Sequence, residues 1–163
     1  MVDYGRPASV FCRLTNMKAP RTIVLDGTES SQGRALLLIS ALSLCAADLA
    51  GDRLRFVNVS DSAVSTAIEV MKWETGLDVE VTAKGKHPSE ASLFVGANLY
   101  AAISFCSTAH LHLEEANASD VPTLVAIQFP GADALTPVSV SLLGAAHDPE
   151  RFASRLVNML HRV

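Results

Sequence analysis

The side chains that could most readily bind a ligand or take part in a reaction lie between two apolar segments, in residues 104–118. Two adjacent carboxylates, Glu114 and Glu115, follow a short polar stretch after an apolar run that ends at Cys106. Ligands of open parallel sheets bind in the crevice at the carboxyl ends of the strands. A carboxylate soon after such a strand end can accept both hydrogen bonds of a ribose diol. The competing interpretation is that both carboxylates stay in solvent and complement a helix dipole.

Two histidines and a serine in the same stretch fit no standard catalytic or metal-binding pattern. His110 and His112 are two residues apart, so a helix would point them to different faces; they make a poor metal pair, although one could line the crevice. Ser107 lies in no Gly-x-Ser-x-Gly turn, so a hydrolase triad is not expected. We therefore expect no metal site, and the sequence assigns no catalytic residue.

A second candidate site is the loop that contains Gly27 and Gly33 and precedes a predicted helix. A strand, a glycine-containing loop and a helix N-terminus form a general anion-binding arrangement, in which glycines let the backbone approach the ligand. Arg34, in the first helical turn, could reach a phosphate. However, Asp26 and Glu29 bring negative charge to the loop, and it is neither a G-x-G-x-x-G nor a Walker loop. A phosphate site and a purely structural loop both stay open.

The elements that would hold these residues alternate between strands and helices. Apolar, β-branched runs predict strands, and longer stretches with capping residues predict helices. The predicted strands span residues 22–25, 54–59, 78–82, 101–105, 123–127 and 138–143. The predicted helices span residues 34–49, 63–74, 87–99 and 108–118, and a last helix starts at 147–150.

Several helix ends carry recognisable signals. Ser60 or Asp61 can cap the second predicted helix, and Gly76 can stop it. Gly51 stands where we expect the cap of the first helix, and Asp148 with Pro149 opens the last one. Strands that alternate with helices of this length predict a parallel sheet covered on both faces. We therefore expect an α/β fold, a single Rossmann-like three-layer α/β/α domain with a mostly parallel sheet of about six strands.

Composition limits the function classes. The chain has 163 residues, of which 49% are hydrophobic and 18% charged, which suits one folded domain over residues 21–163. Residues 1–20 read as an extension or linker, with an edge strand as an option for residues 10–14. The formal charge is −4 with no basic cluster, so nucleic acid is not the expected partner.

Location is inferred from the cysteines and from the absence of targeting signals. Cys12, Cys45 and Cys106 fit neither zinc spacing nor a disulfide framework, so we expect reduced thiols and a cytoplasmic protein. The longest apolar run, residues 35–50, contains polar residues and is short for a membrane span. No membrane span is therefore expected.

From Arg21 to the C-terminus, the order and spacing of several short motifs resemble a known family. The chain resembles the C-terminal, nucleotide-sugar-binding half of the retaining glycosyltransferases of group 1, the family-4 type with the GT-B fold. The motifs that carry the resemblance are Gly27, Gly33-Arg34-Ala35-Leu36, Thr75-Gly76, residues 87–93, Glu115-Ala116 and Asp148-Pro149-Glu150. Glu115-Ala116 fits the Glu-Ala of the family's Leu-Glu-Ala-Met signature.

The resemblance implies a donor site at the strand ends. It implies that Arg34 faces a donor diphosphate, helped by backbone N–H groups near Gly27, and that Glu115 holds the ribose of the nucleotide. Ser104 and Ser107 would border the sugar. The reaction implied is hexosyl transfer, in which positive charge and no metal or other cofactor stabilises the leaving group.

Three positions of this chain differ from the family pattern. Ser107 stands where the first of the two signature glutamates would fall, Asp26 where a diphosphate-binding lysine often stands, and Asp120 where a glycine is usual. The family also has an N-terminal Rossmann-like half that binds the acceptor, and this chain holds one half only. We therefore expect a nucleotide-sugar-binding domain that is inactive alone. The alternatives are a non-catalytic scaffold or homodimerising module that has lost donor binding, and, more weakly, another nucleotide-binding Rossmann-type protein.

Overall fold

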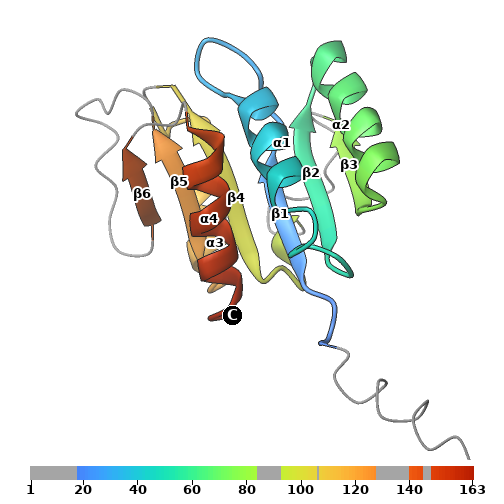
Figure 1. Cartoon of the computed structure of the whole chain (residues 1–163). Helices are drawn as coiled ribbons and strands as arrows, with labels where there is room; N and C mark the ends of the chain where they lie inside the picture. Colours follow the sequence, from blue (N-terminus) through green and yellow to red (C-terminus); the bar gives the residue numbers. More distant parts are fainter. Residues whose placement is uncertain (1–17, 84–92, 106, 128–139, 145–147) are drawn as a thin grey trace, which may run out of the picture.

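Six parallel strands form a single sheet in the order β3-β2-β1-β4-β5-β6. The computed structural model describes residues 18–83, 93–105, 107–127, 140–144 and 148–163. All strand pairings given for these residues are parallel, and Figure 1 shows the strands side by side with their arrowheads at one edge. The strands are β1 Thr22–Asp26, β2 Arg53–Val59, β3 Asp78–Ala83, β4 Leu99–Ser104, β5 Thr123–Ile127 and β6 Val140–Gly144.

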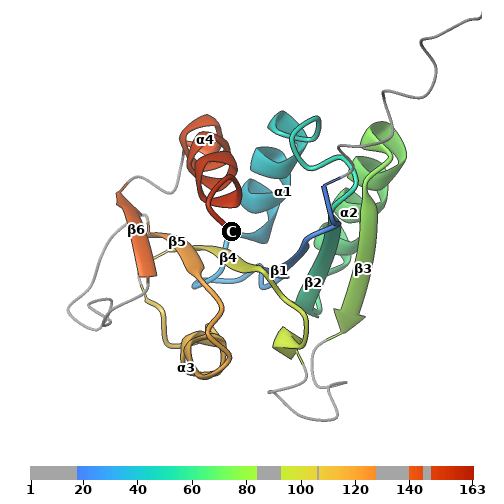
Figure 2. The same cartoon turned by 90° about the horizontal axis from the view of Figure 1, so that it is seen from below.

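Helices cover both faces of the sheet, as Figure 2 shows from below. The helices are α1 Ala35–Leu44, α2 Ser62–Thr75, α3 Leu113–Ala118 and α4 Pro149–Leu160. The larger core cluster joins one sheet face to α1, α2 and α4; it includes Leu25, Leu38, Phe56, Ile68 and Phe152. The smaller cluster joins the opposite face to α3 and the turn at Leu93–Phe94. The expected three-layer α/β/α Rossmann-like fold is confirmed.

Side-chain alternation explains why one strand serves two cores. Ile23 and Leu25 of β1 lie in the larger cluster, whereas Val24 between them lies in the smaller one. Successive strand residues point to opposite faces, so a strand that is buried on both faces reads as a continuous apolar run. The same physics makes β1 recognisable in the sequence and gives the sheet no solvent-facing side at its centre.

Expected signals mark both ends of α2 and the start of α4. The Asp61 carboxylate accepts from the backbone N–H of Ala63 at 2.7 Å at the start of α2, and Gly76 ends it with φ 69°. Asp148 caps α4 by accepting from the N–H of Arg151 at 3.0 Å, with Pro149 in the first turn. These caps satisfy N–H groups that have no partner inside the helix.

Two predicted helix ends are wrong. The first helix stops at Leu44 and not at 49, because the chain continues in separate turns in which Asp48 N–H donates to the Cys45 carbonyl at 3.0 Å. Gly51 therefore lies well beyond the helix. The helix predicted for 108–118 begins only at Leu113. Before it, the chain forms a separate turn in which Leu111 N–H donates to the Thr108 carbonyl at 3.0 Å, and His112 N–H donates to the Tyr100 hydroxyl at 3.3 Å.

The predicted helix over 87–99 is also wrong at its end, because Leu99 begins strand β4. Gly96, with φ 71°, turns the chain before it. Asn98 then anchors the strand entry: its N–H donates to the Thr22 carbonyl at 2.8 Å and its side-chain oxygen accepts from Thr22 N–H at 2.9 Å. The start of that helix, the edge strand over 10–14, His147, Cys12 and Cys106 lie outside the described residues.

Candidate functional site at the carboxyl edge of the sheet

Three strands deliver polar side chains to one edge of the sheet. Asp26 ends β1, Asn58 lies near the end of β2, and Ser104 ends β4. Because β1 pairs in parallel with both β2 and β4, these strand ends lie next to one another. This is the edge at which open α/β sheets bind ligands, and α3 with Glu115 follows β4 there.

Asp26 is the centre of a buried hydrogen-bond network. The residue is only 3% exposed, and its Oδ1 accepts a hydrogen bond from Thr28 N–H at 3.0 Å. Its Oδ2 accepts from the Asn58 amide at 3.3 Å and from the Tyr100 hydroxyl at 3.4 Å. Burial, with the charge of Asp26, raises the pKa of Tyr100 well above its usual range. Tyr100 therefore stays a neutral hydroxyl that can donate to the carboxylate.

The network continues from Asn58 to the start of α3. The Asn58 amide nitrogen lies 2.8 Å from His112 Nε2. The other ring nitrogen, Nδ1, lies 4.0 Å from Glu115 Oε2, and the two side chains are 15% and 28% exposed. At that separation the contact is electrostatic and not a hydrogen bond. Asp26, Asn58, His112 and Glu115 thus form a line from the buried sheet edge to solvent.

His110 lies beside this line and is the least satisfied polar side chain of the site. Both of its ring nitrogens are buried, and neither has a hydrogen-bond partner. Burial lowers the pKa of His110 below its ordinary value, an effect that nearby Asp26 opposes and His112 reinforces. The ring is therefore held neutral, as expected for an imidazole removed from water without a partner.

Gly27 and Gly33 lie so close to other parts of the protein that neither position has room for a side chain. A Cβ added at Gly33 would lie 2.2 Å from the Thr28 carbonyl oxygen, and one at Gly27 would lie 2.5 Å from a Val59 methyl. Gly27 N–H also donates to the Val57 carbonyl at 2.7 Å. The sequence interpretation gave these glycines to ligand approach, whereas the structure explains both by the close packing of the loop on β2 and on itself.

The start of α1 is occupied by side chains of the chain itself. The Glu29 carboxylate accepts from Leu36 N–H at 2.9 Å, and the backbone N–H of Arg34 donates to the Ile103 carbonyl at 2.9 Å. The Arg34 guanidinium donates to the Ser30 and Gly33 carbonyls and stacks over the Phe105 ring at 4.7 Å. In this arrangement, Arg34 is engaged by the loop, and Glu29 takes the place that we predicted for an anion.

Ser104 and Ser107 tie two loops together. The Ser104 hydroxyl is fully buried between the carbonyl oxygens of Gln32, at 3.0 Å, and Ser107. The Ser107 hydroxyl accepts from Ala109 N–H at 3.1 Å, and the residue is 8% exposed. Both serines therefore hold the loops around the site in place through hydrogen bonds to backbone groups.

The structure thus brings all five residues of the predicted donor site to one edge, but in different roles. Gly27, Ser104 and Ser107 are buried in the loops, Arg34 is partly exposed and bonded to its own loop, and Glu115 is a partly exposed carboxylate. Sequence reasoning missed two network residues, Asn58 and Tyr100, and it also missed the central position of Asp26 in the network. Asn58 had one detectable signal, a polar amide at a predicted buried strand end. Tyr100 had none, because it lies between the predicted helix over 87–99 and the predicted strand over 101–105.

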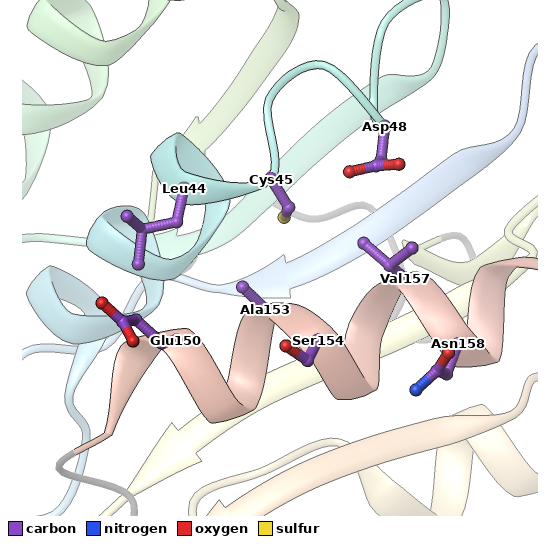
Figure 3. Close-up of a pocket in the computed structure, with 8 residues that line it drawn as sticks. All are labelled: Leu44, Cys45, Asp48, Glu150, Ala153, Ser154, Val157 and Asn158. Atoms are coloured by element: carbon purple, nitrogen blue, oxygen red, sulfur yellow. The ribbon is translucent and has the colours of Figure 1, made fainter.

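A separate hollow lies far from this edge, between α1 and α4. It has a volume of about 470 Å³ and is lined by Leu44, Cys45, Asp48, Glu150, Ala153, Ser154, Val157 and Asn158. Figure 3 shows the Cys45 sulfur pointing toward α4 across this groove. Burial and the charge of Asp48 raise the pKa of Cys45 to about 11, so the thiol stays protonated and unreactive.

The described part of the chain lacks two features, a cluster of metal-ligating side chains and a membrane-spanning helix. Within the described residues, no group of three or more His, Cys, Asp or Glu side chains is arranged to hold a metal ion. None of the helices in that part of the chain has both the length and the apolar character needed to cross a membrane.

The fold was compared with known proteins. No protein-family model matches the sequence, and no curated protein is similar to it by sequence. Solved structures do match in fold. The lipopolysaccharide outer core galactosyltransferase WaaB in its apo form has a TM-score of 0.65 and 15% identity over 90% of this chain and 42% of that chain.

Two further solved structures match with similar TM-scores. Anabaena HepE in complex with UDP-glucose has a TM-score of 0.64 and 16% identity over 87% of this chain and 39% of that chain. WaaG, a glycosyltransferase involved in lipopolysaccharide biosynthesis, has a TM-score of 0.64 and 16% identity over 88% of this chain and 39% of that chain. The chain spans about two fifths of the length of these proteins. The resemblance to GT-B glycosyltransferases is confirmed at the level of the fold: this chain has the Rossmann-like fold of one part of such enzymes.

Proposed function

We propose that this domain binds a nucleoside-diphosphate sugar at the carboxyl edge of its sheet, as the donor-binding part of a hexosyl-transferring enzyme. The observation that carries the proposal is Glu115, a partly exposed carboxylate that stands just beyond the end of β4 and beside His112. A carboxylate at this edge can accept hydrogen bonds from a ribose diol. Support comes from the shared fold with HepE, whose structure contains UDP-glucose.

The proposal includes a missing partner domain. The chain covers 42% or less of the three solved glycosyltransferases compared above. Transfer of a sugar requires an acceptor and a site closed against water, because a water molecule would otherwise take the sugar. We therefore expect this part to bind the donor without transferring it, and to need a second Rossmann-like half for activity. A cytoplasmic location and the use of no metal or other cofactor belong to the same proposal.

Calorimetric titration tests donor binding. UDP, ADP and GDP sugars are titrated into the wild-type chain, into Glu115→Ala and into Glu114→Ala. The last variant is a matched control, because Glu114 carries the same charge on the same helix and is exposed. We expect one nucleotide class to bind the wild type and the Glu114→Ala control, and binding to be at least tenfold weaker in Glu115→Ala. The proposal would be wrong if no nucleotide sugar gave a heat of binding, or if Glu115→Ala and Glu114→Ala bound the nucleotide sugar with equal affinity.

A second candidate is the homodimerising module. The favouring observation is the outer face of α2, where Trp73 is 86% and Val70 is 50% exposed one helical turn apart. Large exposed apolar side chains in a patch often mark a protein contact. Sedimentation of the wild type and of Trp73→Lys tests it: a dimer that the substitution abolishes supports this function, and a wild-type monomer at every concentration rejects it.

A further inference from the structure

Asn58 has a backbone conformation that is uncommon for any residue with a side chain. Its φ is 62°, in the left-handed region, where asparagine is tolerated better than most residues. It lies at the irregular end of β2, where the pairing with β3 shifts register between Phe56 and Val59. The side-chain amide is thereby held between two elements that are far apart in sequence, β1 with Asp26 and the entry to α3 with His112.

The neighbours of Asn58 fix the orientation of its amide. The Asp26 carboxylate can only accept hydrogen bonds, so the Asn58 group that faces it must be the NH₂. The reversed amide would set two oxygens against each other. The NH₂ group has two hydrogens, and the same nitrogen contacts Asp26 Oδ2 at 3.3 Å and His112 Nε2 at 2.8 Å. His112 Nε2 is therefore an acceptor.

An accepting Nε2 settles the tautomer of a neutral His112. Its proton must then be on Nδ1, the nitrogen that faces Glu115. The result is a donor, Nδ1–H, and an acceptor, Oε2, with 4.0 Å between the two atoms. A hydroxyl oxygen placed about 2.8 Å from each would fit between them at an angle of about 90°. It would accept from His112 and donate to Glu115, a pairing that a hydroxyl can complete because it is both an acceptor and a donor.

From this geometry we propose that His112 and Glu115 together recognise one ribose hydroxyl of the donor, and that Asn58 is the positioning residue that keeps His112 in the required tautomer. The proposal rests on the function proposed above and deepens it. It gives the site a preference for ribonucleotides over the corresponding deoxynucleotides.

Deoxynucleotides and His112 variants together test the proposed hydrogen bond between His112 and the ribose hydroxyl. UDP, ADP and GDP, each with its 2′-deoxy and 3′-deoxy forms, are titrated into the wild type, His112→Leu and His112→Asn. We expect one deoxy form to bind the wild type about tenfold or more weakly, because the hydroxyl that it lacks makes two hydrogen bonds. His112→Leu should bind the ribonucleotide about three- to tenfold more weakly, the range of one hydrogen bond, and should bind that deoxy form as the wild type does. His112→Asn, whose amide can donate from a position close to that of Nδ1, should recover part of the loss.

The tautomer is measured without a ligand, by long-range ¹H–¹⁵N correlation of the His112 ring. We expect the Nδ1–H form in the wild type and a mixture in Asn58→Gly, a variant that keeps the left-handed backbone unstrained. Wild-type His112 in the Nε2–H form would overturn the positioning role of Asn58. If wild type and His112→Leu discriminate equally between ribo and deoxy forms, the hydroxyl recognition is wrong while the proposed function stands. If no nucleotide binds at all, the proposed function itself fails.

Discussion

The two edges of the sheet use buried polar groups in opposite ways. At the amino edge, Arg21 and Asp52 are 8% and 5% exposed and share several hydrogen bonds, one of them 3.0 Å long. Arg21 also donates to the Leu160 carbonyl, and so joins the starts of β1 and β2 to the end of α4. At the carboxyl edge, the network from Asp26 to Glu115 opens to solvent and leaves both His110 ring nitrogens unsatisfied. A closed network, in which the buried polar groups are paired within the protein, stabilises the fold. An open network, which extends to solvent, leaves polar groups that a ligand can bind.

The largest effect expected is at the amino edge. Asp52→Ala leaves the Arg21 guanidinium buried without its carboxylate, which costs about 3–5 kcal/mol of the free energy of unfolding. Asp78→Ala is the matched control, because the Arg53–Asp78 pair is 56% and 67% exposed. Exposed pairs contribute about 0–1 kcal/mol. Urea unfolding of both variants makes the comparison; equal losses would contradict the closed-network interpretation.

Tyr100→Phe removes one hydroxyl from the carboxyl edge and changes no shape. Asp26 loses a donor, and the N–H of His112 loses its acceptor. We expect a loss of about 1–2 kcal/mol in the free energy of unfolding, less than for Asp52→Ala because Asp26 keeps Thr28 and Asn58. Urea unfolding measures the loss. An unchanged midpoint and slope would show that this network does not hold the start of α3.

His110→Leu has a smaller effect of the opposite sign. It removes two buried nitrogens that have no partner, so we expect stability at pH 7.5 to stay equal or to rise by up to about 1 kcal/mol. The folded pKa of His110 lies below the ordinary value of 6.5, so the unfolded chain binds the proton more readily. The wild type therefore loses stability as the pH falls below about 6.5 toward the lowered folded pKa. Urea midpoints between pH 7.5 and 5 should fall less steeply in His110→Leu; parallel curves would refute the assignment.

The smallest effect on folding is expected at the proposed contact residue. Glu115→Gln and Glu114→Gln should each change the free energy of unfolding by less than about 0.5 kcal/mol, because both side chains are at least partly exposed. Thermal unfolding monitored by circular dichroism measures both variants. A loss of more than about 2 kcal/mol in Glu115→Gln alone would show that Glu115 stabilises the fold, in contradiction to its proposed role as a ligand contact.

The sequence predicted the fold well because the fold depends on patterns. Strand β5 has the predicted bounds, and the caps Asp61 and Asp148 act at the predicted positions. These signals are local: continuous apolar runs and short-range side-chain caps. Helix α1 was predicted too long because its apolar sequence does not show where the chain leaves the helix.

The site was predicted less completely because its contacts join residues that are distant in sequence. The Asn58–His112 contact spans 54 positions and the Tyr100–Asp26 contact spans 74. The left-handed φ of 54° at Asp120 explains why glycine suits this position, but not what the carboxylate does there. The ligand roles of Gly27, Gly33 and Ser104 stay predictions. In the structure, the two glycines pack against β2 and against their own loop, and the Ser104 hydroxyl donates to the Gln32 carbonyl, contacts that the sequence does not reveal.

The most direct test of the central claim is a ¹H–¹⁵N NMR titration of the wild-type chain with UDP-, ADP- and GDP-glucose. The account predicts that one of them shifts amide signals around Asp26, Asn58, His112 and Glu115 and leaves those of Arg21 and Asp52 unchanged. Shifts confined to the amino edge or to the groove between α1 and α4, or no shifts with any of the three, would contradict it.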